Sequence, residues 1–125
     1  MDEFILLFRM DIISRDAQPS PEQLQEYMKQ YHDWVGGIAA QNKFVSGTGL
    51  PFDGARVVTN KNNKKIVTNG PFGEIKETIG GFIIVRAETV EEAVEFAKGC
   101  PVLTGEGNSM EVRKVSSKNW VHPDP

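Results

Sequence analysis

Glu111 and Arg113 lie two positions apart in a segment of β-type residues. Residues i and i+2 of a strand share one face, so this carboxylate and this guanidinium point the same way. Arg9 and Arg86 occupy similar positions on two other predicted strands. Where these strands are neighbours, the guanidinium groups converge on one carboxylate, and an anionic or carboxylate-bearing small molecule fits such a place. The alternative is that Glu111 forms a structural ion pair with Arg9 or Arg113, and both interpretations stay open here.

A second candidate for ligand binding is the segment formed by Asn69, Gly70, Pro71 and Phe72. Asn and Gly tolerate positive φ and Pro lacks an N–H, so neighbouring backbone amides are free to point towards a ligand. The same residue types also explain a structural turn completely. Phe72 suits either a pocket wall or the core, and the turn is the simpler interpretation.

Acid–base chemistry has two weak candidates, His32 and Glu111, and the catalytic residues are otherwise unknown at this point. His32 lies roughly 100° from the centre of the apolar stripe of its predicted helix, which is a boundary position. The other histidine, His122, and the only cysteine, Cys100, are far apart in the sequence, and this pattern is not typical of a transition-metal site. We therefore predict neither a metal ion nor a cofactor.

Strand and helix signals alternate along the chain. Apolar or alternating residues predict strands at 4–10, 44–50, 80–86 and 109–115, and a hairpin with strands 56–59 and 65–68 around a turn at 60–64. Capping boxes beginning at Ser20 and Thr89 predict helices over 21–41 and 90–98. The first helix carries an apolar stripe that we expect to face the sheet: Leu24, Tyr27, Met28, Tyr31, Trp34, Val35 and Ile38.

This order of elements is the split βαβ pattern of ferredoxin-like folds with an inserted β-hairpin, so the predicted fold class is α+β. We expect one domain, 1–116, followed by a polar tail at 117–125. Two helices cover only one face of the sheet, yet the first, third and fourth main strands offer apolar residues to both faces. A symmetric partner is the simplest cover for the second face, and we predict a homodimer.

Composition and charge argue against several classes of protein. The chain has 14 Lys and Arg against 17 Asp and Glu, and its net charge of −3 without a basic stripe argues against direct nucleic-acid binding. The one continuous apolar run, 4–8, is too short to cross a bilayer or to form a signal-peptide core. A lone cysteine excludes an internal disulfide. We expect a cytoplasmic protein without a membrane partner.

Residues 67–82 read VTNGPFGEIKETIGGF and resemble the signature of the YCII-related family, specifically its DGPF branch. Members of that branch read roughly V-T-D-G-P-F-A-E-x-K-E-x-x-G-G-F/Y, and the other elements of this chain follow in the family's order. The resemblance implies a dimeric α/β barrel, in which two ferredoxin-like protomers pair sheet against sheet around a cleft. It implies no common reaction, and it suggests functional association with a sigma factor only because some relatives are joined to, or encoded beside, such factors.

The sequence also departs from that pattern. Asn69 stands where the DGPF aspartate would be, and an amide has no accessible pKa, so an acid–base role of that position cannot be transferred. Gly73 replaces a usual alanine, and Lys114 replaces a frequent proline. Some relatives outside the branch have a helix histidine that is thought to pair with an aspartate. That histidine falls at Tyr31, so we expect the pair to be absent here.

Two functions from different classes follow from these observations. The first is a homodimer that binds a small, anionic molecule in the intersubunit cleft without turnover, with a regulatory role. The alternative is a cofactor-free enzyme of lyase or isomerase type that acts in the same cleft.

Overall fold

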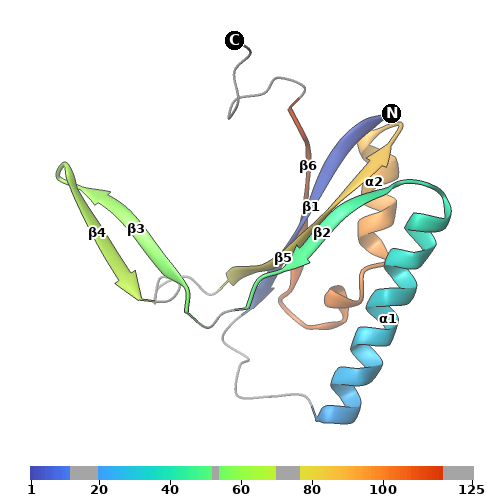
Figure 1. The fold of residues 1–125 in the computed structure, drawn as a ribbon, viewed down its shortest axis with the longest axis horizontal. Helices are drawn as coiled ribbons and strands as arrows, with labels where there is room; N and C mark the ends of the chain where they lie inside the picture. The colour runs from blue at the N-terminus through green and yellow to red at the C-terminus, as the bar shows by residue number, and fades with distance from the viewer. Residues whose placement is uncertain (12–19, 52–53, 70–76, 117–125) are drawn as a thin grey trace.

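The computed structural model describes residues 1–11, 20–51, 54–69 and 77–116 (Figure 1). These residues form, in chain order, β1 (Asp2–Asp11), α1 (Pro21–Ala40), β2 (Phe44–Gly49), β3 (Arg56–Lys61), β4 (Lys64–Asn69), β5 (Glu77–Ala87), α2 (Val90–Lys98), the short 3₁₀ helix η2 (Pro101–Thr104) and β6 (Ser109–Lys114). The predicted order of strands, hairpin and helices is therefore confirmed. The tail at 117–125 and the segment 70–76 lie outside the described residues.

Four strands form one antiparallel sheet in the order β2-β5-β1-β6. The first and third main strands, β1 and β5, are therefore central, as in a ferredoxin-like fold. Both helices lie on one side of this sheet (Figure 1). The α+β class predicted from the sequence is confirmed.

Both α-helices begin at the predicted caps. Ser20 accepts a hydrogen bond from the Gln23 N–H, and the Gln23 side chain accepts one from the Ser20 N–H, which completes the capping box. Thr89 accepts from the Glu92 N–H at the start of α2, 3.1 Å away. In the part of the chain that is described, no helix is long and apolar enough to cross a membrane.

The hydrophobic core lies between the sheet and the two helices. Leu6, Ile83 and Val85 are the largest side chains that are fully buried there. Around them pack the other buried apolar residues, namely Phe4, Phe8, Ile38, Ala87, Ala93, Ala97, Cys100 and Val102. Cys100 is thus a buried structural residue, as one expects of a lone apolar thiol.

The N-terminal half of the apolar stripe of α1 lies on the side of the helix that faces the sheet, but it is not buried there. Ile38 is the buried residue of this helix, whereas Leu24 is 51% exposed and Met28 is 41% exposed. Near its C-terminal end the helix is held by Trp34, whose indole N–H donates to the Phe96 carbonyl at 2.8 Å. Towards Pro21 the helix diverges from the sheet (Figure 1).

The hairpin turn is shorter than the predicted turn at 60–64. Asn62 and Asn63 both have positive φ, 53° and 65°, so two residues suffice to reverse the chain. The strands consequently extend to Lys61 and Lys64. This hairpin forms a separate two-stranded sheet that stands away from the four-stranded one (Figure 1).

Candidate functional site

The face of the sheet opposite the helices is the surface on which the predicted binding residues lie. Ile5 and Leu7 of β1 pair in register with Ile84 and Phe82 of β5, and all four are only partly buried within one chain. We call these four residues and the charged residues beside them the open face. Within β6, Met110 and Val112 pack on the helix side, so Glu111 and Arg113 are the residues that this strand turns to the open face.

Three of the predicted residues meet on the open face, and we call Arg9, Glu111 and Arg113 the arginine–glutamate cluster. An Nη1 atom of Arg9 lies 3.3 Å from Oε1 of Glu111, within hydrogen-bonding distance. Arg113 approaches the other carboxylate oxygen at 3.7 Å. The strand register explains this meeting, because Glu111 lies opposite Leu7 and Arg113 opposite Ile5.

The cluster carries more positive than negative charge. Two guanidinium groups share one carboxylate, and the side chain of Arg113 remains 70% exposed while that of Glu111 is 38% exposed. Exposed ion pairs contribute about 0–1 kcal/mol to stability, so these contacts add little to the fold of a single chain. Glu111 instead positions the Arg9 guanidinium through their hydrogen bond.

Of the predicted binding residues outside this cluster, the structure describes Asn69. Asn69 ends β4, where it is exposed and pairs in register with Arg56, so it belongs to the hairpin. Gly70, Pro71 and Phe72 lie outside the described residues. Arg86 is on the open face, opposite Glu3 in the register.

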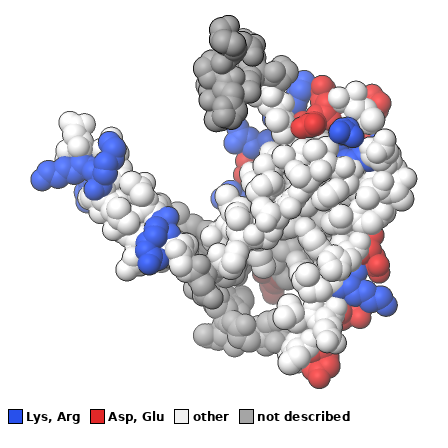
Figure 2. Space-filling view, viewed as in Figure 1, with Lys and Arg blue, Asp and Glu red and all other residues white. Residues whose placement is uncertain are grey.

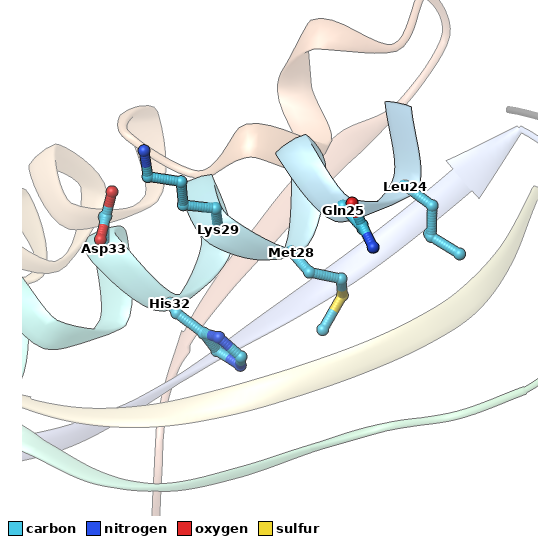
Figure 3. A pocket seen from close by; sticks show the side chains of 6 residues that line it. All are labelled: Leu24, Gln25, Met28, Lys29, His32 and Asp33. Carbon is cyan, nitrogen blue, oxygen red and sulfur yellow. The ribbon is translucent and has the colours of Figure 1, made fainter. Parts of the chain in front are cut away.

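His32, the other weak catalytic candidate, is exposed on α1, on the opposite side of the sheet from Glu111. It lines a shallow hollow of about 490 Å³ together with Leu24 and Met28, which lie along the same side of the helix (Figure 3). The structure therefore does not bring the two acid–base candidates together.

A cavity of about 710 Å³ lies on the helix side, where the N-terminal half of α1 diverges from the sheet. We call it the tyrosine cavity, and its described lining residues are Phe8, Met10, Leu24, Tyr27, Met28, Tyr31, Gly49, Leu50, Pro51 and Gly80. Its volume is in the range of small-molecule sites. Tyr31 is the position at which the family resemblance places the histidine of some relatives.

The two tyrosines supply the hydroxyl groups of this otherwise apolar lining. Burial, with smaller effects of Cys100 and Tyr31, raises the pKa of Tyr27 to about 12, and burial also raises the pKa of Tyr31. Both hydroxyls therefore stay protonated at neutral pH. Sequence reasoning missed this cavity because helical periodicity assigns all four stripe residues in it to the core.

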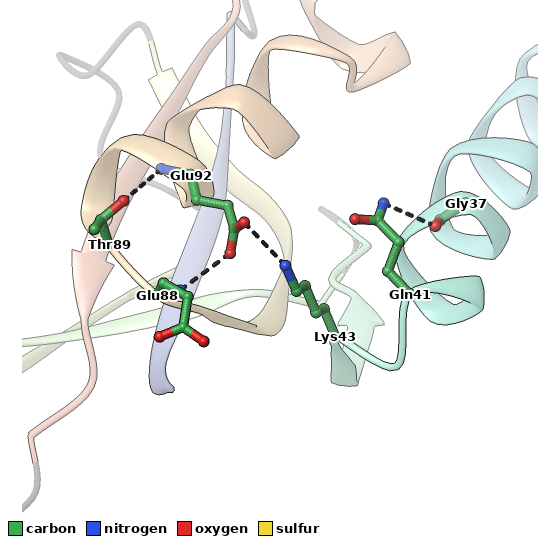
Figure 4. A network of polar contacts seen from close by, with 6 residues as sticks. All are labelled: Gly37, Gln41, Lys43, Glu88, Thr89 and Glu92. Carbon is green, nitrogen blue, oxygen red and sulfur yellow. Dashed lines mark hydrogen bonds and ion pairs between the residues drawn. The ribbon is translucent and has the colours of Figure 1, made fainter.

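A further polar network joins the residue before β2 to the first turn of α2, and it is structural. Lys43 Nζ lies 2.9 Å from Oε2 of Glu92, whose Oε1 accepts from the Glu88 N–H at 3.0 Å (Figure 4). The hydrogen bond from Lys43 is the main cause that lowers the pKa of Glu92. Across the described ranges, no group of three His, Cys, Asp or Glu residues is placed to hold a metal ion.

Comparison with known proteins places these features in a family context. The sequence model of the YCII-related domain matches residues 9–117, a stretch that contains the whole arginine–glutamate cluster. An uncharacterized protein of Rhizobium meliloti (strain 1021) is 29% identical over 85 residues, which are 62% of this chain and 68% of that protein.

Proposed function

The chain belongs to the YCII-related family, and from this premise we propose that it is a homodimer that binds a small anionic molecule between the open faces of its two protomers. The observation that carries the proposal is the arginine–glutamate cluster on an apolar sheet face that the two helices leave uncovered. A regulatory role of such binding, as in a DGPF-type protein, is part of the same proposal.

The apolar part of the open face supports dimerisation. Ile5, Leu7, Phe82 and Ile84 lie at the centre of the sheet, on its two central strands. Burial of apolar surface gains about 25 cal/mol per Å², and sheets pack face to face about 10 Å apart. A second copy related by a two-fold axis would bring the same four residues against these four.

The charged part of the open face supports anion binding. In such a dimer the clusters of both protomers would border one cleft, where exclusion of water strengthens the attraction between charges. An arginine fork matches the two oxygens of a carboxylate or phosphate. The 3.3 Å contact with Glu111 would hold the Arg9 guanidinium in place for this contact.

The test compares Arg113→Ala with Lys114→Ala. Lys114 is the neighbouring cation on the opposite face of β6, where it pairs with Asp2 at 3.4 Å, so it is a matched control. Titration calorimetry with inorganic phosphate and a panel of small carboxylates should show binding to the unaltered protein. Loss of one charge-assisted contact costs about 1.5–3 kcal/mol, so Arg113→Ala should bind roughly tenfold to a hundredfold more weakly.

Lys114→Ala should bind as the unaltered protein does, and both variants should remain dimers. If Arg113→Ala lowers the stability of the fold and no probe binds the unaltered protein, the cluster is a structural ion-pair network. If Tyr31→Ala abolishes binding while Arg113→Ala does not, the molecule binds in the tyrosine cavity and the proposed site is wrong.

A further inference from the structure

The hairpin formed by β3 and β4 has no hydrophobic core of its own. Its described residues pack extensively only against each other, in a ribbon of two six-residue strands. An isolated two-stranded hairpin is marginally stable in water, and a third strand or a packing partner is generally required. We therefore expect the hairpin to be stabilised by packing against another surface.

Apolar side chains project from both faces of this hairpin. On one face Val58 and Val67 are cross-strand partners, 65% and 62% exposed. On the other face Ile66 is also exposed, opposite Thr59. β-branched cross-strand pairs of this kind are typical of strands that are partly buried.

The charge of the hairpin is opposite to that of the rest of the chain. Residues 56–69 contain four cationic residues, Arg56, Lys61, Lys64 and Lys65, and no Asp or Glu. The remaining chain therefore has ten of the 14 Lys and Arg against all 17 Asp and Glu. In Figure 2 the charged side chains on the hairpin are Lys and Arg, whereas the body shows acidic side chains together with other Lys and Arg side chains.

The position of the hairpin relates it to the open face. It projects on the side of the sheet that faces away from α1 and α2 (Figure 1). A second protomer that covered the open face would occupy the same side, within reach of the hairpin, and outside its own hairpin that protomer carries a net negative charge. Charge complementarity and position thus both favour a second copy of this chain as the partner of the hairpin.

We infer that the β3–β4 hairpin is a dimerisation arm, which packs its valine pair and its lysines against the body of a second copy of this chain. The inference rests on the proposed homodimer and adds a second contact region to it. Each protomer would then hold the other through its arm as well as through its open face.

The test reverses charge on the arm with Lys64→Glu/Lys65→Glu. Lys29→Glu/Lys98→Glu is the control, because it makes the same change in net charge at exposed positions on the two helices. Sedimentation velocity over a dilution series at low salt gives the dimer Kd of each protein. The Kd of the arm variant should be at least tenfold higher than that of the unaltered protein. Added salt should reduce this difference in Kd, because it screens the charges of the arm. The helix control should change the Kd by less than twofold.

A labelling experiment tests the contact directly. In Val67→Cys the new thiol should react slowly with a maleimide at concentrations where the protein is dimeric and rapidly after dilution to monomers. Cys100 is buried and contributes little to the early reaction. Equal labelling rates in both states, or an unchanged Kd in the arm variant, would overturn the inference.

The experiments distinguish failure of the arm hypothesis from failure of the dimer hypothesis. If the unaltered chain is a monomer at all concentrations, or Ile84→Lys leaves its association unchanged, the proposed open-face dimer is wrong. If Ile84→Lys abolishes the dimer while both arm tests show no effect, the dimer survives and only the arm is refuted. If Val67→Cys is protected only after a polyanion such as RNA is added, the occupant is a polyanion and the inference is wrong.

Discussion

The two faces of the four-stranded sheet have the same backbone but different surroundings. Along β1, Phe4, Leu6 and Phe8 point to the helices and are buried, whereas Ile5 and Leu7 alternate with them and are only partly buried. Both faces of β1 therefore carry apolar side chains. What differs is that α1 and α2 cover one face, while the other would need a cover from elsewhere.

The difference extends to charge. On the helix side, burial raises the pKa of Cys100 to about 11 and that of Tyr27 to about 12, so both groups stay neutral at physiological pH. On the open face, three charged side chains share ion pairs and keep part of their surface exposed. The helix side is thus suited to packing, and the open face is suited to contacts with other molecules.

The largest expected effect is a difference in stability between mutations on the two faces of the sheet. Leu6→Ala should destabilise the fold by about 2–5 kcal/mol, because it leaves a cavity in a fully packed core. Leu7→Ala, at the next position on the open face, should cost less than half as much at protein concentrations low enough to favour monomers. Urea unfolding followed by circular dichroism measures both. Equal costs would show that both faces are equally packed within one chain.

Alkaline pH should lower the free energy of unfolding through groups that are buried on the helix side, and we expect this effect to be smaller than that of Leu6→Ala. The pKa of Cys100 rises from 9.0 to about 11 on folding, so the stability gained by burying the neutral thiol is complete below pH 9 and is lost between about pH 9 and 11. Tyr27 adds a similar loss between about pH 10 and 12. The urea midpoint should fall across this range, and Cys100→Ala should flatten the first part of the curve. An identical slope in Cys100→Ala would contradict the assignment.

The smallest expected effect is the loss of stability when the N-cap of each α-helix is removed. Thr89→Ala removes the N-cap of α2, a helix that buries Ala93 and Ala97, and should cost about 1 kcal/mol. Ser20→Ala removes the corresponding cap of α1, where the first turn is exposed, and should cost less. Thermal unfolding of the two variants provides the comparison. A larger loss in Ser20→Ala would mean that the N-terminal half of α1 contributes more to stability than its exposure indicates.

The sequence alone determined the elements and their order, because the signals involved are local. The capping box at Ser20 and the N-cap hydrogen bond at Thr89 involve residues three positions apart, and strand alternation involves residues two positions apart. The same period of two predicted that Glu111 and Arg113 share a face. The register between β1 and β6 then brought Arg9 to them.

Only the tertiary structure decided how closely these elements approach one another. Helical periodicity shows which side chains of α1 lie on one side, but not that the helix contacts the core at Ile38 and leaves Leu24 exposed. Likewise, composition cannot show that Asn69 extends a strand opposite Arg56, or that the hairpin stands apart from the sheet. Such distances depend on contacts between residues far apart in the chain, as in the 2.8 Å bond from Trp34 to Phe96, and no local pattern encodes them.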